Sequence, residues 1–470
     1  MHSGTDVDCV SFVPSHAMAA LNQSKITVAD IDARLAMLLR VRFRLSHFDP
    51  IGPLDNIPAS TICSDYAQKL SHDGPRQAAT LLKNDARTLP LSLATVGQVA
   101  VIGPNANLSR DDAGYYGPNN VCGNDFWTLV DALAEDGAVR VSSVLGVPDV
   151  QSEDQSGIAA AVAVAKAVET VVLAVGTDLN WAAEGHDAKN ISFTDAQLAL
   201  IAQVSAAAAK PVIVVVMTAT PLDLSPLLSN PKVGAILHVG QPSLTIIGVA
   251  DLLYGRASPA GRMVQTVYPA AYQEQISIFD FGMRPGPSPW ARPDCTNTNA
   301  SACERGTNPG RTYRFYTGTA VVPFGFGLSY TTFQYSPLTA AKRTISLAHA
   351  RAVIATRAAL GHPFVRHEEL RAAETAVNWA TEAAFSVNVT NTGSMDADEA
   401  VLGFVVPPSA GEGGVPLKSL FGFERVHVRR GETVTVTLYP SLSDFMAVDA
   451  AGAYVLLVTK WMWQHGFPLF

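Results

Sequence analysis

The chain has 470 residues, of which 48% are hydrophobic and 16% are charged, so it can bury more than one core and form two or three domains. Its formal charge of −8 comes from acidic and basic residues scattered without long runs, which argues against a surface for nucleic acid or for an anionic membrane. The longest apolar run, at 212–217, is far too short to cross a bilayer, so no membrane-spanning segment is predicted.

The first predicted element is an amphipathic helix. Thr27 and Asp30 have the spacing of a capping box, and apolar residues then recur at helical intervals up to the Phe-Asp-Pro of 48–50, where proline ends the helix. One helix and the short segment before it cannot close a core by themselves. Residues 1–58 are therefore expected to be part of a larger domain.

Residues 59–335 alternate strands with helices. Short β-branched runs without alternation predict strands buried on both faces of a mostly parallel sheet. They lie at 98–103, 170–176, 211–216 and 234–238. Helices are predicted between them at 157–169, after a capping box formed by Thr194 and Gln197, and at 244–254. This order of elements predicts an α/β layered domain.

The last part of the chain changes character. Residues 336–384 are rich in alanine and arginine and are predicted to be helical or disordered, with no function assigned. Residues 385–470 contain alternating segments, 385–390 and 433–438, and a further strand at 453–458. Turn residues at 391–393 and 430–432 separate these strands, so we predict a β sandwich.

Two aromatic-rich strings, GRTYRFYTG at 310–318 and PFGFGLSYTTF at 323–333, have no periodicity and indicate an ordered connection packed by its own rings. They resemble the connection between domains in the β-xylosidase-like branch of glycoside hydrolase family 3. Strings at 41–50, 81–84, 258–262 and 420–425 are similar to the same family. The resemblance implies that 1–58 is the last strand and helix of a (β/α)8 barrel, that 59–335 is the family's C-terminal α/β sandwich domain, that 336–384 is an insertion and that 385–470 is a fibronectin type III-like domain.

Candidate chemistry lies at 176–187, because this segment leaves a buried strand at its carboxyl end. Retaining glycoside hydrolysis needs a nucleophilic carboxylate and a proton-donating carboxyl group about 5 to 5.5 Å apart. By position in the family's loop, the resemblance implies that Glu184 is the general acid/base, and burial against Trp181 could raise its pKa for that task. A solvated loop acid is the alternative. The residues expected to bind substrate or to position Glu184 are Asp178, Trp181, His186 and Asp187.

The sequence also departs from the family pattern. Ala182 stands where the family usually has another acid, and Ala188 where it usually has an arginine. The family's nucleophilic aspartate and the sugar-binding residues of its barrel lie upstream of the region that matches Met1, and they have no counterpart here. We therefore expect a truncated enzyme that is inactive in isolation.

The resemblance implies an extracellular parent enzyme that releases terminal β-xylose from xylo-oligosaccharides by double displacement, without a metal or an organic cofactor. One alternative is a sugar-binding or structural remnant, and another is a β-glucosidase or α-arabinofuranosidase of the same family. A nucleotide-binding protein is disfavoured, because the turn at 103–107 reads GPNAN rather than GxGxxG.

The five cysteines lack the spacing of a zinc site. Cys295 and Cys303 bracket a polar loop, for which a disulfide and two unpaired thiols are equal alternatives. The first residues have neither the basic nor the apolar region of a signal peptide, so none is predicted in this chain. N-glycosylation sequons shift the interpretation only modestly towards secretion. They begin at Asn22, Asn107, Asn190, Asn299 and Asn388.

Overall fold

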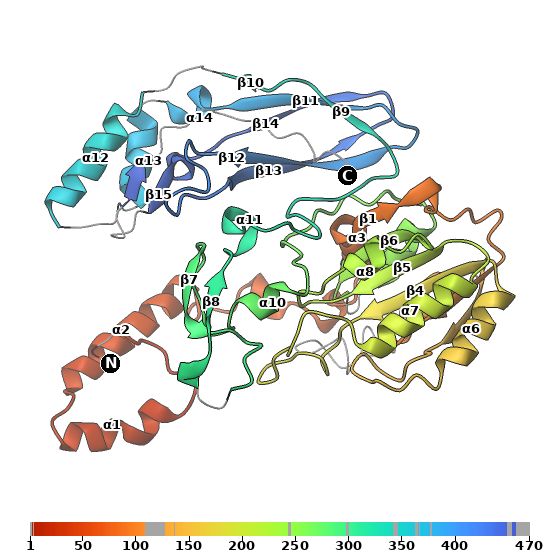
Figure 1. Ribbon diagram of the computed structural model, residues 1–470. Helices are drawn as coiled ribbons and strands as arrows, with labels where there is room; N and C mark the ends of the chain where they lie inside the picture. Colours follow the sequence, from red (N-terminus) through yellow and green to blue (C-terminus); the bar gives the residue numbers. More distant parts are fainter. Residues whose placement is uncertain are drawn as a thin grey trace. The chain divides into compact units, whose positions relative to one another are not determined.

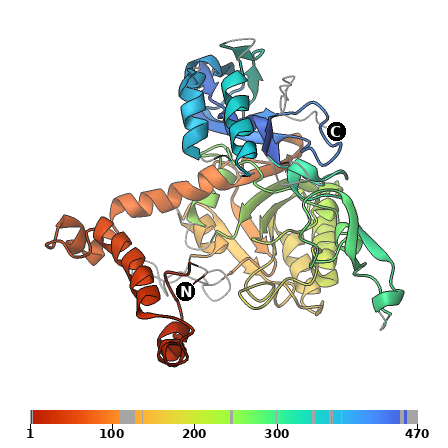
Figure 2. The ribbon, with the colours of Figure 1, turned by 90° about the vertical axis from the view of Figure 1, so that its left-hand side faces the viewer.

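The computed structural model describes residues 2, 4–108, 127–135, 137–242, 246–297, 300–341, 346–361, 365, 367–376, 378–448 and 454–456. It has two units, Met1–Ala67 and Gln68–Phe470, which are described separately. Figures 1 and 2 show the ribbon from two directions. Within the described ranges, a helix of the length and apolar character needed to cross a bilayer does not occur.

The first unit is helical. It contains α1 (Phe12–Asn22), α2 (Val28–Arg44), the 3-10 helices η1 (Pro53–Asn56) and η2 (Ala59–Thr61), and the start of α3 (Asp65–Ala78). The predicted capping box is confirmed: the Thr27 hydroxyl accepts the N–H of Asp30, and the Asp30 carboxylate accepts the N–H of Thr27. The helix ends at Arg44, before the predicted proline, because Ser46 adopts a left-handed conformation with φ 57°. Neither α1 nor α2 has a buried residue.

The strand expected at the start of the chain is not formed, so this prediction was wrong. Residues 4–8 are irregular and mostly exposed. The Asp8 carboxylate accepts the N–H of Val10 at 3.2 Å and of Val13 at 2.6 Å, which turns the chain directly into α1. A strand needs a neighbour to pair its backbone groups, and the described residues of this unit contain no other strand.

The second unit is built on a six-stranded sheet in the order β1-β6-β5-β4-β2-β3. The strands are β1 (Thr80–Asn84), β2 (Gln98–Ile102), β3 (Arg140–Val144), β4 (Thr170–Gly176), β5 (Val212–Met217) and β6 (Val233–Gly240). All neighbours run parallel except β1, which is antiparallel to β6. The four predicted strands are confirmed, and β5 is buried along its whole length, as a central strand covered on both faces must be.

Helices cover both faces of this sheet. One core contains residues of α6 (Ile158–Ala167) and α7 (Asp195–Ala207), and Figure 1 shows these two helices on the same side of the sheet. The other core contains residues of α5 (Leu129–Ala134) and α9 (Ile247–Leu253). The shorter helices are η3 (Asp85–Arg87) and α8 (Ser225–Leu228). The α/β layered fold is therefore confirmed.

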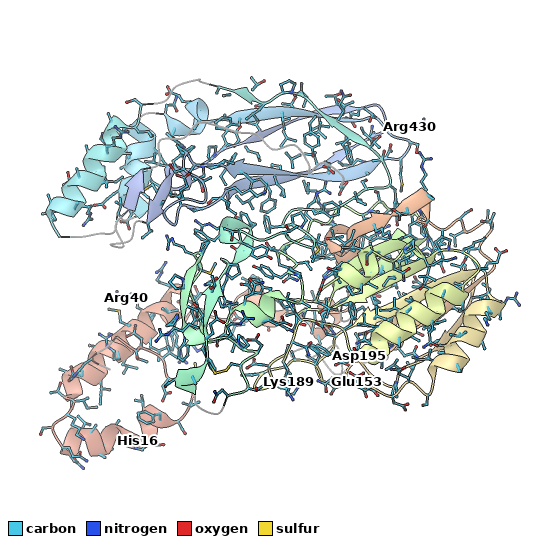
Figure 3. All side chains as sticks on the ribbon, viewed as in Figure 1. His16, Arg40, Glu153, Lys189, Asp195 and Arg430 are labelled. Carbon is cyan, nitrogen blue, oxygen red and sulfur yellow. A yellow bond between two sulfur atoms is a disulfide. The ribbon has the colours of Figure 1, made fainter. Side chains whose placement is uncertain are left out.

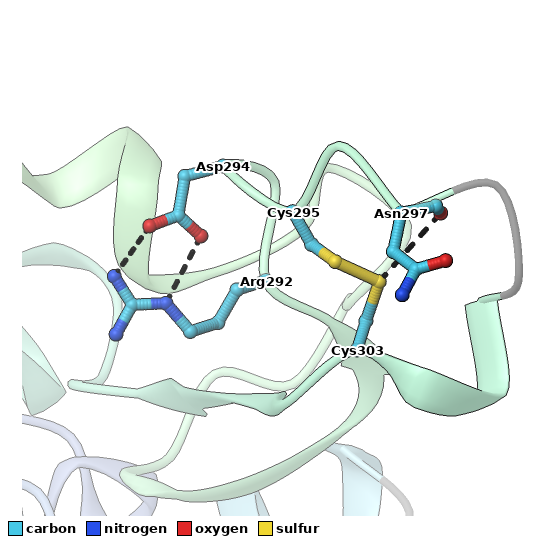
Figure 4. The surroundings of a disulfide bond; sticks show 5 residues. All are labelled: Arg292, Asp294, Cys295, Asn297 and Cys303. Carbon is cyan, nitrogen blue, oxygen red and sulfur yellow. Dashed lines mark hydrogen bonds and ion pairs between the residues drawn. A yellow bond between two sulfur atoms is a disulfide. The ribbon is translucent and has the colours of Figure 1, made fainter.

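A connecting segment follows the sheet. It contains α10 (Tyr272–Gln275), β7 (Gly286–Ala291), η5 (Ala300–Ala302), β8 (Arg305–Asn308) and α11 (Thr312–Phe315), with β7 antiparallel to β8. Cys295 and Cys303 form a disulfide with a Cα–Cα distance of 5.9 Å, which decides between the two alternatives left by the sequence. Figure 4 shows this bond beside the ion pair of Arg292 and Asp294.

The C-terminal part forms antiparallel β structure. One sheet contains β9 (Phe333–Tyr335), β10 (Thr339–Ala340), β11 (Phe385–Asn391) and β14 (Thr433–Leu438), and β12 (Ala397–Val405) pairs separately with β13 (Ser419–Val428). A short pair contains β15 (Met446–Val448) and β16 (Tyr454–Leu456). Val389 and Val436 of the first sheet share one core with Val401 and Val428 of the second pair, so the two layers pack face to face.

The alanine- and arginine-rich segment is mainly helical in its described residues. It contains α12 (Ala348–Ala359), α13 (His367–Ala376) and α14 (Trp379–Glu382). The Trp379 indole N–H donates to the carbonyl oxygen of Pro440 at 2.6 Å, just before η6 (Leu442–Phe445). Leu370 and Ala373 share a core with Val405. These helices thus pack on the end of the β layers, which a disordered insertion would not do.

Candidate active-site loop

The candidate site begins where β4 leaves the sheet. Gly176, its last residue, has φ +146°, and a Cβ there would collide with the main chain of Met217 on β5. Gly103, just after β2, has φ +132° and meets the main chain of Ala174 in the same way. Only glycine allows this conformation together with such a close approach. The two glycines therefore set how the chain leaves the carboxyl edge of the sheet.

Gly176→Ala is expected to destabilise the protein by about 3 kcal/mol or more, because the methyl group would displace the backbone of β5 and strain φ. The measurement is the free energy of unfolding from urea titration. Gly97→Ala is the matched control, because Gly97 has no positive φ and nothing within 4 Å of the added Cβ. Equal effects of the two substitutions would contradict the steric argument.

Asp178 shapes the first turn of the loop that runs from 177 to 194. It is only 8% exposed. Its Oδ1 accepts the N–H of Asn180 at 2.8 Å and of Trp181 at 3.1 Å, which is an Asx-turn. Trp181 is 7% exposed, so its ring packs inside the protein. These two expected site residues lie in the base of the loop.

Glu184 lies at the tip of the loop. Ala183 and His186 exchange both backbone hydrogen bonds, at 2.8 and 2.9 Å, so Glu184 and Gly185 are the central residues of a tight turn. Gly185 supplies the φ of +75° that such a turn requires at its second central position. The Glu184 side chain is exposed, whereas Trp181 is buried. The expectation that Trp181 buries Glu184 was therefore wrong, because the turn points this side chain outwards.

The other two expected site residues are also at the tip. His186 is exposed, and its Nε2 lies 3.0 Å from the carbonyl oxygen of Asn180, which ties the tip to the base. Asp187 is exposed as well, and so is Lys189, which Figure 3 labels. The structure thus brings Glu184, His186 and Asp187 into one charged, open segment. Whether they act on a substrate stays a prediction.

Sequence reasoning missed the residues that hold the far end of the loop. The N–H of Ile191 donates to Gln273 Oε1 at 2.9 Å, and its carbonyl oxygen accepts the N–H of Asp223 at 2.7 Å. Ile191 also packs against a tyrosine cluster with Tyr272 and Tyr316, and burial raises the pKa of Tyr272 to about 12. Tyr316 belongs to the first aromatic string, which was the available signal.

A carboxylate from another segment binds the start of α7. The Glu153 carboxylate accepts the N–H of Ala196 at 3.0 Å. Glu153 therefore lies beside Asp195, the first residue of α7 (Figure 3). Negative charge at this end of a helix is favourable because the N-terminal N–H groups carry partial positive charge. The described residues include no cluster of His, Cys, Asp and Glu suited to a metal ion.

A partly buried histidine stands near the same edge of the sheet. His238, on β6, accepts the N–H of Gly240 at Nδ1 (3.4 Å), and burial lowers its pKa from 6.5 to about 4. Because the folded pKa is below the unfolded one, the unfolded chain binds the proton first, and stability is lost as the pH falls from 6.5 to 4. Between pH 7 and pH 4 the free energy of unfolding should fall by about 2 to 3 kcal/mol more in the chain without substitution than in His238→Gln. Urea unfolding at pH 7, 5 and 4 measures this difference. Parallel pH profiles for the two proteins would contradict this.

Comparison with known proteins identifies the family of this chain. Residues 79–330 match the glycosyl hydrolase family 3 C-terminal domain. A probable β-D-xylosidase 6 of Arabidopsis thaliana is 33% identical over an alignment of 465 residues, which covers 97% of this chain and 55% of the relative. A probable exo-1,4-β-xylosidase of Aspergillus clavatus is 34% identical over 478 residues, covering 100% of this chain and 56% of the relative.

Solved structures agree with this result. A family 3 exo-β-xylosidase in complex with a xylobiose aziridine activity-based probe superposes with a TM-score of 0.78 and 30% identity, over 95% of this chain and 53% of that one. The chain thus spans about half the length of the relatives it matches. Because the matched domain model covers more than half of its residues, this chain belongs to glycosyl hydrolase family 3.

Proposed function

We propose that this chain supplies the general acid/base, Glu184, of a retaining β-xylosidase that releases terminal xylose from xylo-oligosaccharides. The observation that carries the proposal is the tip of the 177–194 loop, where a turn closed by two backbone hydrogen bonds holds Glu184 as an exposed residue. Relatives named β-xylosidases and a structural relative that holds a xylobiose-based probe support xylose as the sugar.

In this mechanism Glu184 donates its proton to the departing glycosidic oxygen while a carboxylate nucleophile attacks the anomeric carbon. It then takes a proton from the water that hydrolyses the glycosyl-enzyme intermediate. His186 and Asp187, exposed beside it, are proposed to contact substrate, whereas Asp178 and Trp181 are proposed to act through the shape of the loop. An exposed carboxyl group suits this role if a second protein surface completes the site around it.

We further propose that the 470 residues alone hydrolyse no xyloside, because the chain spans about half the length of its relatives and the resemblance places the family's nucleophilic aspartate in the part that it does not span. Residues 1–58, which form the expected helix α2 but not the expected strand, are proposed to come from the end of a (β/α)8 barrel. Residues 59–335 are proposed to be the family's α/β sandwich domain, 336–384 an insertion and 385–470 a fibronectin type III-like domain. The parent enzyme is proposed to act outside the cell. The disulfide between Cys295 and Cys303 supports this, because such bonds persist in oxidising compartments.

The test assays the pure chain with nitrophenyl β-xyloside, α-arabinofuranoside and β-glucoside, and with xylobiose in a calorimeter. No nitrophenol release is expected. A fusion of the chain to the part of the Aspergillus clavatus relative that it does not span is expected to hydrolyse the xyloside fastest. Turnover by the pure chain, abolished in Glu184→Gln, would overturn its proposed inactivity. Binding of xylobiose with no turnover by either protein would favour a sugar-binding remnant, and a preference for another glycoside would favour that specificity.

A further inference from the structure

The third residue of α7, Gln197, has an unusual set of partners. It is fully buried, with 0% of its surface exposed. Its Oε1 accepts the N–H of Gly176 at 3.1 Å, and its Nε2 donates to the carbonyl oxygens of Gly176 at 3.1 Å and of Val150 at 2.9 Å. Both donors of the amide and its oxygen are thus bonded to main chain.

This arrangement replaces the capping box that the sequence predicts. The Thr194 hydroxyl accepts the N–H of Gln197 at 3.2 Å, which is one half of such a box. The other half, a bond from the backbone N–H of Thr194 to the Gln197 side chain, is not formed, because that side chain is turned inwards to Gly176. The complete boxes at Thr27 and Thr128 show that the chain forms this motif elsewhere.

The partners of Gln197 join the two ends of one loop. The 177–194 loop starts directly after Gly176 and ends directly before α7. The bonds between Gln197 and Gly176 therefore join the two ends of the loop. Thr177 is held by the segments that follow β2 and β5: Asn105 Nδ2 donates to its carbonyl oxygen at 3.1 Å, and its hydroxyl lies 2.7 Å from the Thr218 hydroxyl. Those contacts hold the start of the loop, whereas the bonds of Gln197 link its start to its end.

We propose that Gln197 is a positioning residue for Glu184: its amide closes the base of the 177–194 loop and so determines where the tip stands. The inference rests on the proposed role of Glu184. An apolar side chain of similar size at this position would leave the N–H of Gly176 and two carbonyl oxygens buried without these partners, which favours opening of the base.

The test compares Gln197→Met with Gln203→Met, because Gln203 lies on the same helix and is exposed. Hydrogen exchange of the full chain is expected to be about tenfold faster or more for amides of 177–194 in Gln197→Met, and unchanged in β5. The control should leave both regions unchanged. Equal exchange of the loop in the two variants would overturn the proposal.

A second measurement reports the tip itself. Glu184→Cys carries a trifluoromethyl tag, in a Cys9→Ser background because Cys9 is an exposed free thiol. The fluorine resonance is expected to shift or broaden when Gln197→Met is added and to stay unchanged with Gln203→Met; an unchanged line with Gln197→Met would contradict the proposal. Neither readout uses turnover, so a failure of Glu184 as the acid/base would leave both results valid.

Should Gln197→Met fail to fold, the chain without substitution still tests the idea. The side-chain amide protons of Gln197 are expected to exchange at least about a hundredfold more slowly than those of Gln203, because they are buried and bonded to main chain. Similar exchange of the two side chains would overturn the proposal.

Discussion

Glu399→Gln is expected to lower the free energy of unfolding by about 3 kcal/mol, because it leaves a largely buried guanidinium without its counter-ion. Glu399, on β12, is 5% exposed, and its Oε2 lies 2.6 Å from Arg262. The Tyr335 hydroxyl donates to the other carboxylate oxygen, and burial together with this carboxylate raises the pKa of Tyr335. Glutamine keeps the size of the side chain, so the loss measures charge and hydrogen bonding.

The neighbouring residue provides a matched control. Asp398 pairs with Arg425 at 3.4 Å, and both side chains are about one-third exposed, so Asp398→Asn should cost about 1 kcal/mol or less. Urea unfolding with unchanged m-values measures both. Because two buried charges also cost desolvation, Arg262→Met combined with Glu399→Met should recover much of the loss. Equal losses for Glu399→Gln and Asp398→Asn, or no recovery in the double variant, would contradict the argument.

This ion pair joins two layers of the second unit, since Arg262 follows the α/β sheet and Glu399 belongs to the β layers. Aromatic rings accompany it. Tyr313 stacks on Phe324 with ring centroids 4.2 Å apart, and the Phe404 ring stands 5.9 Å from Tyr313. The two aromatic strings recognised in the sequence are thus the packed connection between these layers, as their lack of periodicity indicated.

Much of the fold could be predicted where one local signal suffices. β5 is a buried β-branched run, and α2 starts at a complete capping box. β3 was missed because its middle residues, Ser142 and Ser143, lack the apolar character of a buried strand. The strand expected at the start of the chain did not form, because strand formation depends on a partner, which a local pattern does not supply.

The site was predicted less completely, because its geometry depends on contacts between distant residues. The position of the loop after β4 follows from the strand alone. The exposure of Glu184 depends on a turn made by Gly185, and the base of the loop depends on the amide of Gln197. A glutamine three residues after a threonine has the pattern of a capping box whichever way its side chain turns.

Glu184→Gln is expected to lower turnover of xylobiose by about 10²- to 10⁴-fold in the fusion to the part of the relative that this chain does not span, because the leaving sugar then departs unprotonated. Dinitrophenyl β-xyloside should be affected far less in its first step, since its leaving group is stable as an anion. Added azide should restore turnover of this substrate, because azide attacks the intermediate without a general base. Steady-state kinetics on the two substrates, with and without azide, measures these effects.

The pattern separates proton transfer from other roles of the same residue. Substitution of a residue that merely shapes the loop would lower kcat/KM alike for both substrates, and azide would not restore turnover. Glu135→Gln is the control, because Glu135 is an exposed acid of the same α/β layer, at the end of α5, and should leave both rates unchanged. If Glu184→Gln lowers kcat/KM equally for the two substrates, or by no more than the control does, the exposed Glu184 at the tip of the loop is not the proton donor.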